Sequence, residues 1–174
     1  MKKIKKHDNL LLWIGIAIFS AIMIFRVELQ VGDELWNFQN IYKMVNGYLV
    51  YKQANVIITP IFFWMGEILF KILGANYFVY RLFDVCIYST MILMVYHILK
   101  QLKIEKRKAL IYTLIIHYFI HTIVTGGANY NTLAITFVLL GIYISLKYGF
   151  TKRFTILNGI MMYIIIFTKQ NIGI

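Results

Sequence analysis

Five long apolar runs constrain the fold of this chain more than any other feature. Each approaches the length of about 20 apolar residues that a membrane-spanning helix needs, and flanking Lys, Tyr and Asn side chains can complete the shorter ones. With 60% of its 174 residues apolar and 14% charged, the chain is too hydrophobic for a soluble domain or a disordered one. We therefore predict an all-α polytopic membrane protein with about five transmembrane helices, at 10–28, 77–99, 109–125, 132–146 and 154–169.

The basic residues predict the orientation of these helices. Twelve of the 18 Lys and Arg residues lie in three segments, 1–9, 100–108 and 147–153. An excess of Lys and Arg marks cytoplasmic segments, so we place these three inside, and 29–76 and 126–131 outside. The net charge of +11 is then a signal of topology, and we expect no nucleic-acid partner.

The long outer segment 29–76 predicts two further helices that lie on the membrane surface. Positions 33–46 carry apolar residues at a helical period, and Gly47 follows as a stop. After an irregular stretch at 48–58, Thr59 can cap a second helix at 60–73, in which Pro60 takes the first position and which Gly74 ends. We treat the whole of 1–174 as a single membrane domain with these two juxtamembrane helices.

Two neighbouring acids, Asp33 and Glu34, begin the first surface helix. A carboxylate half-buried at a membrane surface can act as a general base. The alternative is structural, because acids in a first helical turn are favoured by the helix dipole.

Two cations lie toward the outer side. Arg81 either faces an anionic lipid headgroup or pairs with Asp84 three residues later. Lys169, at the outer end of the last span, either snorkels to the interface or binds phosphate.

Motifs of several other site classes are absent or weak. One Cys, Cys86, excludes a disulfide framework and a Cys-based zinc site. His117 and His121 have the spacing of metal ligands, but polar packing between helices explains them better because no Glu-rich frame accompanies them. The chain has no Walker loop, no GxGxxG and no Ser nucleophile elbow, which makes a cytosolic nucleotide site improbable.

A series of short motifs in order resembles the N-terminal half of a GT-C membrane glycosyltransferase. The nearest group is the bacterial relatives of the protein O-mannosyltransferases and of the lipid A aminoarabinose transferase. The motifs are Asp33-Glu34, Gly47-Tyr48-Leu49-Val50-Tyr51, Thr59-Pro60, Gly74, Arg81-Leu82, Asn129-Tyr130-Asn131 and Thr168-Lys169-Gln170-Asn171-Ile172-Gly173. Members of the family usually have more spans and often an outer C-terminal domain. The resemblance therefore implies that the chain is the N-terminal portion of a longer protein.

The resemblance also implies a reaction and its residues. A polyprenyl-phosphate sugar would donate its sugar to an acceptor hydroxyl on the outer face of a bacterial cytoplasmic membrane. Asp33 would be the base, and Glu34 would orient the acceptor or a divalent metal, since metal dependence varies among relatives. Arg81 and Lys169 would hold the phosphate, and the remaining candidates would line the cavity of the acceptor or donor, namely Tyr51, Asn129, Tyr130, Asn131 and Gln170.

The main rival hypothesis is a non-catalytic membrane protein. A small transport or substrate-capture subunit would also be basic, helical and about this long, but it would bind its ligand within the bundle. The long outer segment 29–76 argues against that class. A truncated pseudoenzyme is the other non-catalytic alternative.

Overall fold

The protein is all-helical over the residues that the computed structural model describes, which are 6–26, 28, 32–53, 59–123, 129–149 and 151–169. Eight helical segments follow one another there: α1 (Lys6–Phe25), α2 (Asp33–Val45), α3 (Val50–Gln53), α4 (Ile61–Leu73), α5 (Tyr77–Gln101), α6 (Lys106–Ile123), α7 (Tyr130–Tyr148) and α8 (Lys152–Thr168). This confirms the predicted all-α class.

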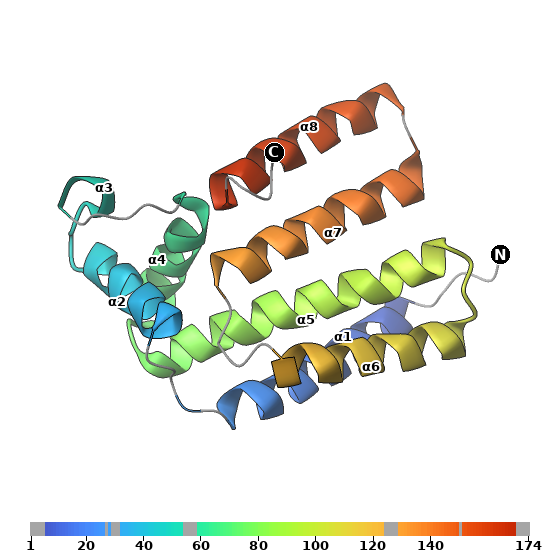
Figure 1. Ribbon diagram of the computed structural model, residues 1–174, viewed down its shortest axis with the longest axis horizontal. Helices are drawn as coiled ribbons and strands as arrows, with labels where there is room; N and C mark the ends of the chain where they lie inside the picture. The colour runs from blue at the N-terminus through green and yellow to red at the C-terminus, as the bar shows by residue number, and fades with distance from the viewer. Residues whose placement is uncertain are drawn as a thin grey trace.

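The helices form two parts (Figure 1). Helices α1, α5, α6, α7 and α8 run back and forth along one direction, and we call them the bundle. Helix α5 is its centre and packs against α1, α6 and α7, while α8 packs on α7. Helices α2, α3 and α4, which we call the cap, lie together at one end of the bundle.

Helix ends follow local sequence signals. Asn76 caps α5, because its side chain accepts a hydrogen bond from the Val79 amide at 3.0 Å. Gly47 follows α2 with a φ of 88°, and Gly74 ends α4 with a φ of 99°. Only glycine adopts such angles without strain, so both predicted helix stops are confirmed.

Two details of the outer segment differ from the prediction. The stretch 48–58, predicted to be irregular, contains the one-turn helix α3. The prediction that Thr59 is the N-cap of α4 is wrong. The N-cap residue is Pro60, and no side-chain hydrogen bond caps this end of the helix. The ring of Pro60 already fixes a helical φ, and its carbonyl accepts from the Trp64 amide at 2.9 Å, so the helix starts without a hydroxyl cap.

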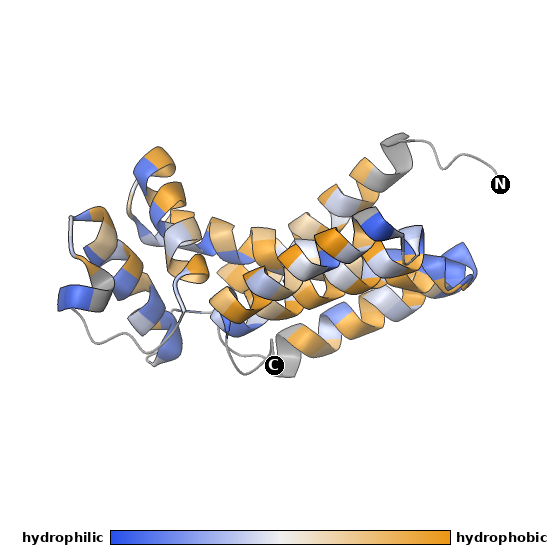
Figure 2. Ribbon diagram, turned by 90° about the horizontal axis from the view of Figure 1, so that it is seen from above, coloured by the Kyte–Doolittle hydropathy of each residue, from blue (hydrophilic) through white to orange (hydrophobic). Residues whose placement is uncertain are grey.

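Two helices, α5 and α7, are long and apolar enough to cross a membrane. The apolar stretches of α1 and α8, Leu10–Phe25 and Phe154–Thr168, are shorter. Figure 2 shows hydrophobic residues along the bundle and a hydrophilic end opposite the cap. These features weakly indicate a membrane protein, and the arrangement of five spans stays a prediction.

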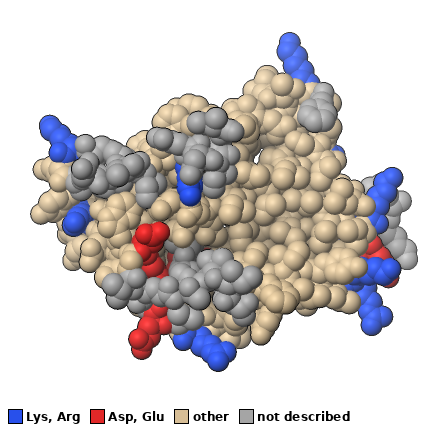
Figure 3. All heavy atoms as spheres, in the orientation of Figure 1, with Lys and Arg blue, Asp and Glu red and all other residues tan. Residues whose placement is uncertain are grey.

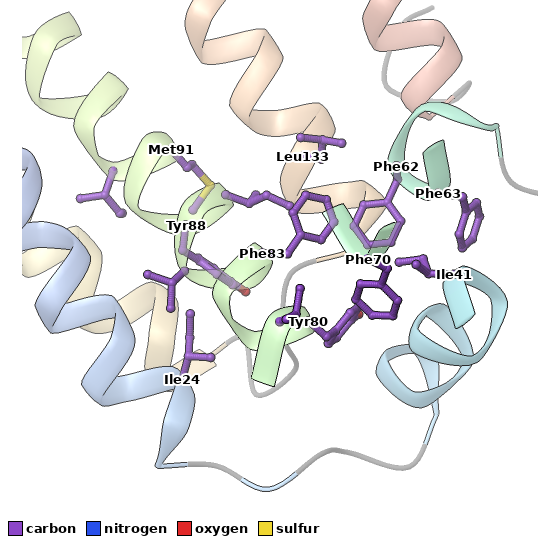
Figure 4. Close-up of a cluster of buried hydrophobic side chains, with 14 of the residues drawn as sticks. Ile24, Ile41, Phe62, Phe63, Phe70, Tyr80, Phe83, Tyr88, Met91 and Leu133 are labelled. Atoms are coloured by element: carbon purple, nitrogen blue, oxygen red, sulfur yellow. The ribbon is translucent and has the colours of Figure 1, made fainter. Parts of the chain in front are cut away.

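An aromatic core joins the cap to the bundle (Figure 4). Phe62 of α4 has no exposed surface, and its ring lies 5.5 Å from that of Phe83 on α5 and 6.4 Å from that of Tyr130 on α7. From α2, Phe38 packs edge-on against Tyr80 of α5 at 5.6 Å. This core fixes the cap over the end of α5 and α7, where the candidate residues lie.

Candidate active site

Polar side chains from four helices meet where the cap joins the bundle. They form two groups, which we call the ion triad (Glu34, Arg81 and Asp84) and the polar cluster (Asp33, Tyr130, Asn131 and Lys169). Residues that are far apart in the sequence are thus brought to one end of the molecule.

The ion triad links α2 to α5 in the interior. The Arg81 guanidinium donates from Nη1 to the Glu34 carboxylate and to Asp84 Oδ2, the latter at 3.3 Å. Its Nε donates to the Tyr77 hydroxyl, and the group lies 4.9 Å from the centre of the Tyr77 ring. Arg81 is only 2% exposed and Asp84 is fully buried. Buried charges of this kind require partners, and here they hold the first turn of α2 against α5.

The triad changes the interpretation of two predicted site residues. The i,i+3 pair of Arg81 with Asp84, one of the two alternatives for these residues, is present. Because Arg81 is enclosed by two carboxylates and a phenol, a phosphate would have to displace Glu34 to reach it. Glu34 is likewise buried, at 4% exposure, in its ion pair with Arg81. The two residues thus tie α2 to α5.

Asp33 differs from its neighbour, because its side chain is exposed. It begins α2 directly after Gly32, which has a φ of 129°. Its negative charge interacts electrostatically with the Tyr130 hydroxyl. The helix turn that buries Glu34 thus leaves Asp33 exposed.

The other members of the polar cluster come from α7 and from the end of α8. The Lys169 ammonium donates a hydrogen bond to Asn131 Oδ1 and lies 5.4 Å from the centre of the Tyr130 ring. Tyr130, Asn131 and Lys169 are all partly exposed. The cluster therefore combines one accessible carboxylate, one cation and two neutral hydrogen-bonding groups.

Asn129, also predicted to line the cavity, caps α7 instead. Its Oδ1 accepts from the amides of Asn131 at 2.8 Å and Thr132 at 3.2 Å. An Asn just before a helix is a strong N-cap signal, and the sequence could have been interpreted that way. This N-cap fixes the first turn of α7, and with it the direction of the Tyr130 and Asn131 side chains.

An apolar pocket of about 410 Å³ lies between α4, α5 and α7. It was not predicted from the sequence. Phe83 lines it two residues after Arg81, and Leu133 lines it two residues after Asn131. The other lining residues are Met65, Ile68, Leu69, Cys86, Ile87, Thr90, Thr136 and Phe137. Residues two apart on a helix point to different sides of it, and no residue of the ion triad or the polar cluster is among those that line the pocket.

The remaining candidates fall into two classes. The side chains of Tyr51 and His121, all of Gln170 and the turn 126–128 lie outside the described residues. His117 is buried on α6 and is hydrogen-bonded to Ser20 of α1 at 2.9 Å, which confirms the predicted polar packing between helices. In the described part of the chain, no three His, Cys, Asp or Glu residues are grouped to hold a metal.

Charge is distributed unevenly along the molecule. The links between α5 and α6 and between α7 and α8 lie at the end of the bundle opposite the cap (Figure 1). These links and their flanks hold most of the described basic residues, and Figure 3 shows Lys and Arg projecting from that end. The polar cluster therefore lies at the opposite end from the basic segments.

Comparisons with protein-family models, with curated proteins and with solved structures found no match. The resemblance to the GT-C glycosyltransferases therefore stays a prediction that depends on the motifs themselves. The site has to be interpreted from its own geometry.

The ion triad makes a prediction about stability. Arg81→Ala should destabilise the protein by about 3–5 kcal/mol, because it leaves two buried carboxylates without their cation. The matched control is Lys71→Ala, which removes the exposed Glu67–Lys71 pair and should cost about 1 kcal/mol or less. Thermal unfolding of the detergent-solubilised protein measures both changes. Equal effects of the two substitutions would contradict the role given to the triad.

Proposed function

We propose that the chain is part of a membrane glycosyltransferase of the GT-C type. It transfers a sugar from a polyprenyl-phosphate donor to an acceptor hydroxyl on the outer face of a bacterial cytoplasmic membrane. In this proposal α1, α5, α6, α7 and α8 are the five spans, and the cap lies on the outer surface. The observations that support the proposal are the exposed Asp33 carboxylate, which interacts electrostatically with Tyr130, the hydrogen bond between Lys169 and Asn131, and the apolar pocket between α4, α5 and α7.

The shape of the site matches the chemistry of a lipid-linked donor. Such a donor joins an anionic phosphate to a long apolar chain. Lys169 offers a cation next to Asn131 and Tyr130, and the pocket between α4, α5 and α7 offers apolar walls from Phe83 and Leu133 onward. A site of this kind favours an amphipathic phosphate over a free nucleotide, because most of the pocket wall is apolar.

The proposed reaction uses these charged groups. An oxygen of the Asp33 carboxylate takes the proton of the acceptor hydroxyl. The acceptor oxygen attacks the anomeric carbon on the side opposite the phosphate, and the bond from that carbon to the phosphate oxygen breaks with its electron pair remaining on the phosphate. The configuration of the sugar is thereby inverted. Lys169 stabilises the charge that develops on the leaving phosphate.

The ion triad supports this mechanism indirectly. Glu34 and Asp33 are adjacent, so the bond between Glu34 and Arg81 fixes the turn that presents Asp33. A base must lie within hydrogen-bond reach of the proton it takes, and a shift of about 1 Å is enough to slow a reaction substantially.

The predicted topology can be tested by cysteine labelling of the full chain in a Cys86→Ser background. Gln39→Cys, on the exposed side of the cap, should react with a membrane-impermeant maleimide added outside intact cells. Glu105→Cys, between α5 and α6, should react only after the membrane is permeabilised. The reverse pattern would overturn the assigned orientation, since positive segments are expected inside.

The catalytic role of Asp33 predicts a selective loss of activity. Asp33→Asn should lower sugar transfer from a polyprenyl-phosphate donor by about 10²–10⁴-fold, because the amide cannot take the acceptor proton. The control is Glu28→Gln, an exposed acid before α2, which should transfer at the wild-type rate. Both variants are assayed in membranes that contain the whole protein, with a labelled donor. Transfer by Asp33→Asn near the wild-type rate would favour the non-catalytic alternative.

A further inference from the structure

A second pocket, of about 560 Å³, lies between the end of α2, α3 and α4. It shares no lining residue with the pocket between α4, α5 and α7. Its walls combine apolar, aromatic and charged side chains: Met44, Val45, Gly47, Tyr48, Leu49, Lys52, Trp64, Glu67 and Lys71. We propose that this pocket, which we call the cap pocket, binds the phosphate headgroup of an anionic membrane lipid.

The charges of the cap pocket suit a phosphate diester. Two of its lining residues, Lys52 and Lys71, are cations, and one, Glu67, is an anion. The Glu67 carboxylate accepts a hydrogen bond from Lys71 at 2.6 Å, which holds the Lys71 ammonium at the pocket wall. The lining residues therefore carry one net positive charge, which the single negative charge of a phospholipid phosphate would balance.

The surface of α4 favours a lipid as the source of that phosphate. Phe62, Phe63, Gly66 and Phe70 are its buried face. The exposed half of the helix is charged on one side and apolar on the other. Glu67 and Lys71 line the pocket, Trp64 comes next around the helix, and an apolar row follows Trp64. In that row Ile68 is 59% exposed and Ile72 is 72% exposed.

This order of side chains is typical of a helix at a membrane interface. Charged residues face water and headgroups, Trp marks the boundary, and apolar residues contact acyl chains. In the proposed complex the lipid phosphate lies between Lys52 and Lys71. The glycerol region of the lipid then covers Trp64, and its acyl chains cover Ile68 and Ile72. A free phosphate or a soluble sugar would leave the apolar row exposed to water, which costs free energy.

The experiment uses Trp64 as a local reporter of bound lipid. In the full chain, Trp13→Phe and Trp36→Phe leave Trp64 as the single Trp, and Phe at position 36 keeps an aromatic ring against Phe63. The protein is placed in phosphatidylcholine vesicles, and brominated phosphatidylglycerol or brominated phosphatidylcholine is added to quench Trp64. We expect brominated phosphatidylglycerol to associate about tenfold more strongly, given the attraction that each Lys exerts on an anionic headgroup.

Matched variants test whether the cap pocket is responsible. The preference for phosphatidylglycerol should be abolished in the double variant Lys52→Gln with Lys71→Gln. The control is a second double variant at the opposite end of the bundle, Lys103→Gln with Lys108→Gln, which should keep the preference. Equal quenching by both lipids, or a preference that survives in the first double variant, would overturn the proposal. Loss of the preference on adding soluble glycerophosphoglycerol would also overturn it, since the site would then recognise a free phosphate. None of these outcomes depends on sugar transfer, so the result is separate from the proposed enzymatic activity.

Discussion

The buried ion pair between Arg81 of α5 and Glu34 of α2 is the interaction on which the rest of the site depends. It joins residues 47 positions apart in the chain, with Asp84 as a second partner of the guanidinium. Charges enclosed at this depth are tolerated only when their partners are correctly placed. The pair therefore selects one orientation of α2, and that orientation leaves the adjacent Asp33 exposed.

Aromatic packing between α2, α4 and α5 further stabilises the junction of the cap with the bundle. Phe38 of α2 contacts Phe70 of α4 and Tyr80 of α5, with ring centres 5.7 and 5.6 Å apart. Gly66 lets α4 approach α2 closely, because a Cβ there would collide with the buried side chain of Ile41. Close packing of this kind holds α2 and α4 together and against α5.

Much of the fold could be predicted from the sequence, while the site was predictable only in part. The apolar runs and the glycines after α2 and α4 are local signals, and the helices follow them within a few residues. The burial of Glu34 and Arg81 is a tertiary effect, which no local pattern reveals. The same holds for the pocket behind Phe83 and Leu133, since its walls come from three helices. The N-cap role of Asn129 is a local signal, since Asn directly before a helix favours a cap.

Lys169 provides the most direct test of the central claim, which is that the polar cluster holds the phosphate of a lipid-linked donor. Native mass spectrometry of the whole protein in detergent can measure how strongly it retains a polyprenyl phosphate. Lys169→Gln should weaken retention about tenfold or more, because it removes the cation of the cluster. Lys152→Gln, at the opposite end of α8, should leave retention unchanged. Equal retention by the wild-type protein and Lys169→Gln would contradict the assignment of this cluster as a phosphate site.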